Sequence, residues 1–321
     1  MTYQGPSFQF VEEIQWEELS KSGGFGPRTS PLLIKGAVRA WPAWDNWSFD
    51  KLADLKRKDG SEVSATFQDG LVEQGVTREP PRLAISPYLR QLGRQAENSV
   101  SRGGLLPVER LESLGRDATF HLDWSHMQSF EPNKLYLAQW NILDEFPELR
   151  KDFAIRSLWP GWRWTWEFVF MGPANTVTGL HYDFPNNWFC QVRGTKEVIL
   201  FPPDQSPHLC RSSKYDWGAT LSDINISRLG EQPDKRESFA KARGLYACVE
   251  AGDALFIPRQ NWHAVVSREP SISLAVFGLT PAEIILNGGR SEFKQLLHRA
   301  GLYRKNNCTC HKMTPAAKNV V

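Results

Sequence analysis

A His-x-Asp triplet and a distant histidine restrict the folds that this chain of 321 residues can adopt. Alternate side chains of a β-strand point to the same face, so His181 and Asp183 can face inward together while Tyr182 points outward. The apolar run that ends at Trp262-His263 predicts a second core strand. Two imidazoles and one carboxylate on one side of a metal, with the opposite positions open, are the ligand set of non-haem Fe(II) oxygenases. The two strands must therefore lie close together, although they are far apart in the sequence.

Short strands separated by turns dominate the middle of the chain. Aromatic side chains at every second position from Trp164 to Phe170 indicate a strand with one buried face. The other expected elements are a continuation of the ligand strand to about Val192, a turn at Arg193-Gly194, a strand over 196–201, a turn at Gly252-Asp253 and a strand over 272–277. This pattern favours a mainly β fold with flanking helices, a double-stranded β-helix (jelly roll), over a parallel α/β sheet, which would need a helix between strands.

The flanking regions divide the chain into an amino-terminal part over 1–120, a core over 121–280 and a carboxy-terminal part over 281–321. The amino-terminal part is expected to contain a strand over 31–36, a helix over 49–58 capped by Ser48 and a mobile loop at Gly103-Gly104. Within the core, a long polar insert over 207–245 is expected to sit over the mouth of the barrel.

The carboxy-terminal part is predicted to form two short helices. Thr280 and Glu283 make a capping box, with proline at the first helical position, and the helix should stop near Gly288-Gly289. Ser291 is expected to cap a second helix with Phe293, Leu296 and Leu297 on one side.

Composition restricts the class of protein more than its activity. The formal net charge is only +2, from 38 basic and 36 acidic residues, so nothing in it demands a nucleic acid or a membrane partner. Five scattered cysteines suit a reducing compartment. The start of the chain lacks the pattern of a signal peptide, so we expect a cytoplasmic protein, or a nuclear one in a eukaryote. Cys308-Thr309-Cys310-His311 could hold a soft metal, but it lies in a polar tail whose last residues, 312–321, are expected to be disordered.

The motifs together resemble the JmjC family of cupin-fold oxygenases, in particular its protein hydroxylases. The segments that carry the resemblance are Thr178-Gly179-Leu180-His181-Tyr182-Asp183, Asn187, Gln191-Val192-Arg193-Gly194-Thr195-Lys196, Leu200-Phe201-Pro202-Pro203-Asp204-Gln205, Gly252-Asp253 and Trp262-His263. The strong part covers about a third of the chain. It implies a JmjC core with the double-stranded β-helix fold.

The resemblance also assigns roles to individual residues. It implies that His181, Asp183 and His263 bind Fe(II), and that Lys196, Thr178 and Tyr136 contact the far carboxylate of the co-substrate 2-oxoglutarate. It places the amide of Asn187 near the metal. An ammonium among neutral donors suits the far carboxylate of a dianionic acid that chelates iron through its other end.

Several positions depart from the family's pattern. Pro185 and Asn186 replace two glutamines of the family's asparaginyl hydroxylase, and an Arg-Gln pair is absent near Ala219-Thr220. Val276 stands where an asparagine is expected, and Gly278 where a tryptophan is common. We interpret these positions as lying on the substrate side of the site, so they leave the substrate open.

The resemblance implies hydroxylation of a residue in a protein or peptide, with O₂ consumed and succinate and CO₂ released. Three alternatives stay open: an N-methyl-lysine demethylase, a small-molecule hydroxylase of a biosynthetic pathway, and a non-catalytic cupin that only binds a ligand. Retention of all three iron ligands and of Lys196 argues against the last. The resemblance further suggests a homodimer formed through the carboxy-terminal helices.

Overall fold

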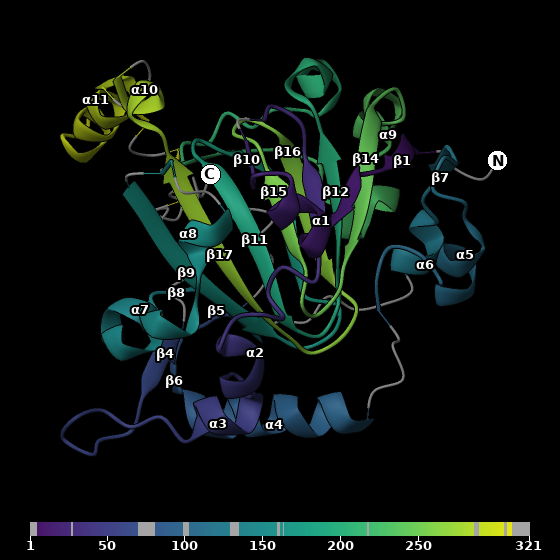
Figure 1. Ribbon diagram of the computed structural model, residues 1–321. Helices are drawn as coiled ribbons and strands as arrows, with labels where there is room; N and C mark the ends of the chain where they lie inside the picture. The colour runs from purple at the N-terminus through teal and green to yellow at the C-terminus, as the bar shows by residue number, and fades with distance from the viewer. Residues whose placement is uncertain are drawn as a thin grey trace, which may run out of the picture.

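Two large β-sheets face each other and form the body of the molecule (Figure 1). The computed structural model describes residues 5–26, 28–69, 81–98, 103–128, 135–158, 161–162, 164–216, 218–285, 289–304 and 307–309. Among these residues, no helix combines the length and the hydrophobicity needed to cross a membrane. The predicted mainly β fold with a jelly-roll core is confirmed.

The first sheet has seven strands in the order β13-β10-β16-β12-β14-β1-β7. They are β1 (Ser7–Phe10), β7 (Phe120–His121), β10 (Val177–Asp183), β12 (Lys196–Phe201), β13 (Ala219–Leu221), β14 (Arg243–Val249) and β16 (Trp262–Ser267). All neighbouring pairs are antiparallel except β1 and β14, which run parallel.

The second sheet has eight strands in the order β2-β3-β15-β11-β17-β9-β8-β5. They are β2 (Glu13–Gln15), β3 (Leu32–Lys35), β5 (Gln68–Asp69), β8 (Leu135–Trp140), β9 (Trp164–Gly172), β11 (Asn186–Arg193), β15 (Ala254–Ile257) and β17 (Ser271–Leu279). A separate pair is formed by β4 (Ser64–Thr66) and β6 (Arg82–Ala84). Strands from the first 120 residues therefore extend both sheets.

Helices cover the outside of the sheets and their ends (Figure 1). They are α1 (Trp16–Lys21), α2 (Ala43–Asn46), α3 (Phe49–Ala53), α4 (Ile85–Asn98), α5 (Val108–Ser113), α6 (Trp124–Gln128), α7 (Ile142–Glu145), α8 (Ile155–Leu158), α9 (Pro233–Phe239), α10 (Pro281–Glu283) and α11 (Gly289–Arg299), with 3-10 turns η2 (Pro147–Asp152), η3 (Pro203–His208) and η4 (Ile226–Glu231). Helices α10 and α11 follow the end of β17, at the upper left of Figure 1.

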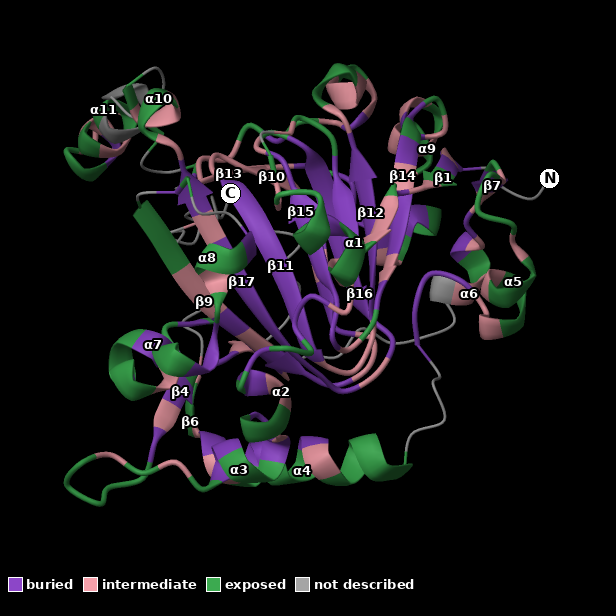
Figure 2. Cartoon of the chain, viewed as in Figure 1, coloured by how far each residue is buried: buried purple, intermediate pink, exposed green. Residues whose placement is uncertain are grey.

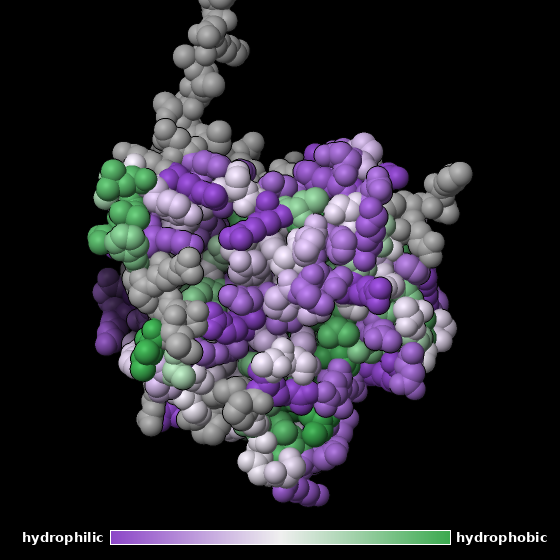
Figure 3. Space-filling view, turned by 90° about the horizontal axis from the view of Figure 1, so that it is seen from above, coloured by the Kyte–Doolittle hydropathy of each residue, from purple (hydrophilic) through white to green (hydrophobic). Residues whose placement is uncertain are grey.

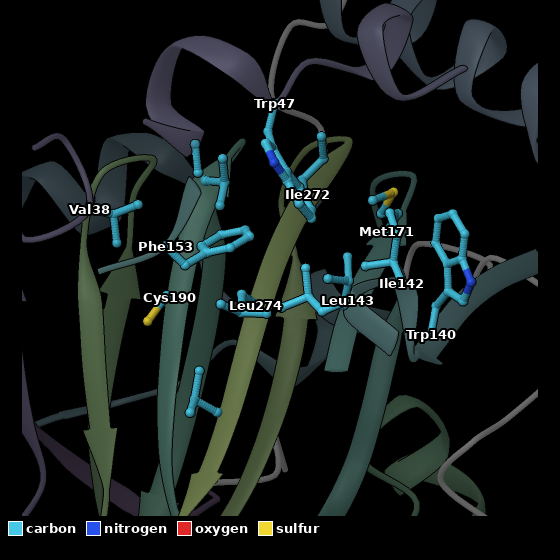
Figure 4. Close-up of a cluster of buried hydrophobic side chains, with 14 of the residues drawn as sticks. Val38, Trp47, Trp140, Ile142, Leu143, Phe153, Met171, Cys190, Ile272 and Leu274 are labelled. Atoms are coloured by element: carbon cyan, nitrogen blue, oxygen red, sulfur yellow. The ribbon is translucent and has the colours of Figure 1, made fainter. Parts of the chain in front are cut away.

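The strands bury side chains on both of their faces (Figure 2). Between the sheets, an inner cluster joins Phe189 and Leu255 of one sheet to Val198 and Val265 of the other. A larger cluster covers the outer face of the eight-stranded sheet and is shown in Figure 4. A third covers the outer face of the seven-stranded sheet. Because successive residues of a strand alternate between faces, these clusters identify which residues can reach the space between the sheets.

The strand with the ligand motif is shorter than the sequence predicts. It ends at Asp183, and β11 begins at Asn186 in the opposite sheet. The expected continuation to Val192 is wrong because Pro185 lies at the crossing, where a residue without an N–H group cannot extend a ladder of backbone hydrogen bonds. The predicted strands over 164–170, 196–201 and 272–277 are confirmed. The insert contributes β13, which adds to the edge of the sheet beside β10.

Two amino-terminal predictions hold and two do not. Strand β3 is confirmed, and the Ser48 hydroxyl accepts a hydrogen bond from the Lys51 N–H as a helix cap, at 3.2 Å. The helix, however, ends at Ala53 and not at Lys58. The expected mobile loop at Gly103-Gly104 is instead buried. Gly104 has a φ of +111°, and a Cβ there would lie 2.1 Å from a carboxylate oxygen of a buried glutamate, so packing requires glycine.

At the carboxy-terminal end, the capping box of Thr280 and Glu283 is confirmed. The predicted stop near Gly288 falls partly outside the described residues. Helix α11 begins at Gly289, so Ser291 lies within the helix and the prediction that it caps this helix is wrong. Cys308 is buried, whereas Cys310, His311 and the tail over 312–321 lie outside the described residues.

Candidate metal centre and the buried lysine behind it

The three predicted ligands converge on the inner face of the seven-stranded sheet. His181 and Asp183 come from β10, and His263 of β16 lies directly opposite His181 in the antiparallel register. Their ligand atoms all lie within 4.8 Å of one another. Asp183 Oδ1 is 3.7 Å from His181 Nε2, and Asp183 Oδ2 is 3.5 Å from His263 Nε2. One divalent cation at their centre could contact all three groups.

Both imidazoles present the same nitrogen to that centre. His181 Nδ1 lies 2.7 Å from the Gly179 carbonyl, and His263 Nδ1 lies 3.0 Å from the Asn261 carbonyl. A carbonyl oxygen can only accept, so each Nδ1 carries the proton and donates it. In the neutral imidazole, Nε2 therefore keeps its lone pair. The hydrogen bond from Nδ1 to the backbone fixes the orientation of the ring, as is usual for metal-binding histidines.

Burial sets the charge state of the ligands before any metal arrives. Burial raises the pKa of Asp183 to about 6, while His181 lowers it and Asp216 raises it further. Burial also lowers the pKa of His263 to about 3, with His181 contributing in the same direction. Asp183 Oδ2 is buried and accepts no hydrogen bond from the described residues. A buried carboxylate oxygen without a donor is a costly arrangement that a cation would relieve.

A β-bulge allows a fourth residue of β10 to join this inner face. Thr178 pairs with Val265, and His181 with His263, but the register shifts between the two pairs. Without the extra residue, side chains three positions apart would point to opposite faces. The bulge thus turns both Thr178 and His181 inward.

Lys196, Tyr136 and Thr178 come together deeper between the sheets. Lys196 Nζ lies 3.4 Å from the Tyr136 hydroxyl, which is also hydrogen-bonded to Thr178. The ammonium is surrounded by the rings of Tyr136, Phe170 and Phe189, whose centroids lie 5.5–6.0 Å away. Gly172 makes room for the tyrosine, because a Cβ there would lie 2.7 Å from the Tyr136 ring.

Lys196 has no counter-ion among the described residues. Its side chain is 1% exposed, and no carboxylate of the described residues lies within ion-pair distance of it. Burial lowers its pKa to about 7. On β12, Leu200 is level with His263, and Lys196 is level with Ser267 further along the strand, an offset of about 13 Å. A cationic group thus lies at the opposite end of the interior from the metal ligands, in a position to bind an anion.

The two residues after Pro185 have different surroundings. Asn187 is buried on the inner face of β11, and its Oδ1 accepts no hydrogen bond from the described residues. Asn186 is fully engaged, because it donates to Glu283 at 2.9 Å and accepts from the Arg259 N–H at 3.0 Å. Asn186 therefore ties α10 to the barrel, and Asn187 is the amide of the pair that remains available to a ligand.

Two departures from the family pattern lie on a different face from the one predicted. Val276 packs in the outer cluster of the eight-stranded sheet, and Gly278 belongs to the same outer face. A Cβ at Gly278 would lie 2.0 Å from the ring of Trp162. The interpretation that these positions lie on the substrate side is wrong. In their strand, Ser273, Ala275 and Phe277 face inward.

Sequence reasoning missed one charged group beside the centre. Asp216 is half-buried and interacts electrostatically with both His181 and Asp183. It precedes the strand that pairs with β10. The insert that contains it is polar and shows no hydrophobic periodicity that would predict a strand. Only the pairing of β13 with β10 brings it close.

Comparisons with known proteins agree with this fold. A family model described as a cupin-like domain matches residues 24–277. The chain is 32% identical over 258 residues to the tRNA wybutosine-synthesizing protein 5 of Gallus gallus, across 78% of this chain and 71% of that protein. The chain therefore belongs to the cupin-like domain family, within the JmjC group of cupin-fold proteins.

Other relatives carry different names. The chain is 26% identical over 260 residues to Lysine-specific demethylase JMJ31 of Arabidopsis thaliana, and 30% identical over 163 residues to Jumonji C domain-containing protein 5 of Drosophila melanogaster. These matches cover 76% and 45% of this chain but only 45% and 38% of the two relatives. JmjC proteins typically are 2-oxoglutarate-dependent oxygenases that use Fe(II).

Proposed function

We propose that this protein is an Fe(II)- and 2-oxoglutarate-dependent dioxygenase that hydroxylates a residue of a protein or peptide. The observation that carries the proposal is the pairing of two unsatisfied sites in one interior. One is a His-Asp-His cluster whose free lone pairs point at a common centre. The other is a buried ammonium without a counter-ion in the described part of the chain. The first suits a divalent cation, and the second suits an anion that spans the space between them.

Two groups of residues would bind the metal and the co-substrate. His181, Asp183 and His263 would hold Fe(II), and Lys196 with the hydroxyls of Tyr136 and Thr178 would bind the far carboxylate of 2-oxoglutarate. Bound there, the two would supply the activation of O₂ that inserts one oxygen atom into a C–H bond, with succinate and CO₂ as products.

Two aromatic side chains lie around the Lys196 ammonium. Phe170 and Phe189 shield the ammonium, which strengthens its attraction for a carboxylate. The Asn187 amide, on the facing sheet, would be available to hydrogen-bond a ligand.

The direct test is succinate production from 2-oxoglutarate by the purified protein with Fe(II) and O₂. We expect slow turnover without substrate, and its loss in Asp183→Ala, His181→Ala and His263→Ala, because each removes one of only three protein ligands. Circular dichroism checks that the variants stay folded. Wild-type succinate production by Asp183→Ala would refute the ligand assignment. No succinate from an iron-loaded wild-type protein would favour a non-catalytic cupin.

A second candidate, an N-methyl-lysine demethylase, is supported by the similarity of the chain to Lysine-specific demethylase JMJ31. Product analysis separates the two. A hydroxylase adds one oxygen to its substrate, whereas a demethylase releases formaldehyde in equal amount. Because the chain is similar to a tRNA wybutosine-synthesizing protein, tRNA should also be tested as a substrate in the same assay. A small-molecule substrate would be recognised as a compound that gains one oxygen atom in a protein-free extract.

We also propose that two copies of the chain associate through the carboxy-terminal helices. Large apolar side chains are exposed there, namely Ile285 at 83%, Phe293 at 59%, Leu296 at 64% and Leu302 at 77%. Hydrophobic side chains gather at the edge of the molecule on that side (Figure 3). Sedimentation should give a dimer for the wild type and a monomer for Leu296→Glu. A monomeric wild type would rule the dimer out.

A further inference from the structure

Arg259 lies on the turn between β15 and β16, at the end of the barrel that carries the candidate metal centre. The Gln260 N–H donates to the Asp183 carbonyl at 3.1 Å, and the Arg259 N–H donates to Asn186 Oδ1 at 3.0 Å. Asp183 is the last residue of β10, and His263 is the second residue of β16. The turn is therefore held at the rim of the site by its backbone N–H groups, whatever side chain position 259 carries.

The guanidinium of Arg259 lies over an aromatic ring beside the metal ligands. Its central carbon is 5.2 Å from the centroid of the Phe184 ring, and Phe184 directly follows the ligand Asp183. The arginine is half-buried, and its buried Nε donates to no acceptor of the described residues. No carboxylate in the described part of the chain lies within ion-pair distance of it. The positive charge is therefore neutralised by no residue that the structure describes.

Arg193 shows how a guanidinium of this protein is arranged when the protein itself satisfies it. It also lies over an aromatic ring, that of Trp44, at 5.1 Å. Its Nη1 donates to the Val192 carbonyl at 2.9 Å, and its Nη2 donates to the Trp44 carbonyl. The Arg259 side chain makes no such bond with the described residues. A ring beneath a guanidinium fixes its plane, so the free N–H groups at its edge can bind a carboxylate or a phosphate through two parallel hydrogen bonds.

We propose that Arg259 binds an anionic group of the substrate, so that the site selects peptides with an acidic or phosphorylated residue beside the one that reacts. The inference rests on the proposed hydroxylation of a protein residue and narrows its substrate. A guanidinium that is half removed from water and lacks a partner costs free energy, which an anion entering the mouth would recover. The net charge of only +2 gives the chain no general attraction to a nucleic acid, which favours a peptide over an RNA.

Peptide binding tests this inference without turnover. Immobilised full-length protein is loaded with Zn(II), as an inert substitute for Fe(II), and with 2-oxoglutarate. Pools of short peptides with randomised flanks carry glutamate, glutamine, phosphoserine or serine at the centre. We expect the wild type to retain at least one anionic pool roughly ten-fold better than its neutral counterpart, which is the value of one charge-assisted hydrogen bond. The pool that is retained identifies the anion as a carboxylate or a phosphate. In Arg259→Gln the ratio should fall close to one.

Two further variants serve as controls. Arg94→Gln removes an exposed arginine of α4 and should keep the wild-type ratio. Arg259→Lys keeps the positive charge and should keep a smaller preference for the anionic pool. Arg259→Gln should bind Zn(II) and 2-oxoglutarate as tightly as the wild type, because it retains the three metal ligands and the backbone N–H that bonds to Asn186.

Equal retention of anionic and neutral pools by the wild type would overturn the proposal, as would an unchanged ratio in Arg259→Gln. If Arg259→Gln lost as much affinity for 2-oxoglutarate as for the peptides, the arginine would belong to the co-substrate instead. Retention of a tRNA transcript that depends on Arg259, without a preference among the peptides, would replace the peptide by an RNA. Failure of the oxygenase assignment appears separately, as absent succinate from the protein loaded with Fe(II).

Discussion

Lys196 and Glu197 are neighbours on β12, both are buried, and their surroundings are opposite in character. Lys196 faces the space between the sheets, where aromatic rings and neutral hydroxyls surround its ammonium. Glu197 faces outward and is completely partnered. Its carboxylate accepts hydrogen bonds from the Tyr246 hydroxyl and the Leu105 N–H and lies 3.3 Å from Arg268.

The difference between Lys196 and Glu197 distinguishes a buried charge that stabilises the fold from one that can bind a ligand. A buried charge that the protein itself satisfies stabilises the fold, since Glu197 fastens the segment around Leu105 to the sheet. A buried charge that the protein leaves unsatisfied destabilises the free protein and is retained for a ligand. The same contrast applies between Asn186, whose amide is hydrogen-bonded, and Asn187, whose Oδ1 accepts no hydrogen bond from the described residues.

Exchanging each charge for an apolar residue should therefore have opposite effects on stability. Glu197→Leu leaves Arg268 buried without its partner and should lower the free energy of unfolding by about 3–5 kcal/mol. Lys196→Met removes an unpaired buried charge and should leave the ligand-free protein equally or more stable, by up to about 4 kcal/mol. Urea titration measures both, and Glu197→Leu combined with Arg268→Met is the control, which should recover most of the loss. Equal destabilisation by both single variants would break the comparison.

The pH dependence of 2-oxoglutarate binding tests the state of Lys196. In the free protein its pKa is about 7, below the 10.5 of an exposed lysine. Between these values the unfolded chain holds a proton that the folded one has lost, so this group makes stability rise with pH across that window. Binding of a carboxylate needs the ammonium, so affinity should fall up to about ten-fold per unit above pH 7. In Lys196→Arg, whose side chain stays protonated, the affinity for 2-oxoglutarate measured by calorimetry should change less with pH.

Asp183 should govern metal binding at the acid side. Its pKa of about 6 means that protons compete with the metal below that pH, whereas His263, with a pKa of about 3, stays neutral. Zn(II) affinity should fall as the pH drops through about 6, by up to about ten-fold per unit. An affinity that is constant from pH 7 to about 5 would contradict this assignment.

The smallest effect is expected at the tyrosine hydroxyl. Tyr136→Phe removes one neutral hydrogen bond near the ammonium, worth about 1 kcal/mol, or roughly a five-fold rise in the dissociation constant of 2-oxoglutarate. Tyr88→Phe is a matched control, because the Tyr88 hydroxyl bonds to the backbone of Leu135, Leu137 and Met171, and no contact of it with Lys196 is found among the described residues. A similar change in both would mean that the tyrosine acts through packing.

Much of the site could be predicted from the sequence because it depends on strand alternation. His181 and Asp183 share a face of their strand because they are two residues apart. The role of Lys196 was implied by the resemblance to the JmjC family. The bulge that turns Thr178 inward depends on pairing with β16, and the outward placement of Val276 depends on the register of β17 with β9. These are tertiary properties that one strand does not encode. Asp216 was missed for the same reason.

Calorimetric titration of 2-oxoglutarate into the protein loaded with Fe(II), without O₂, tests the central claim most directly. The account predicts one molecule bound per chain in the wild type. It predicts binding at least about a hundred-fold weaker in Lys196→Met, since a desolvated charge partner is worth about 3–5 kcal/mol, and a strong loss in Asp183→Ala, which lacks the metal that anchors the other end. Binding to Lys196→Met as tight as to the wild type would contradict it.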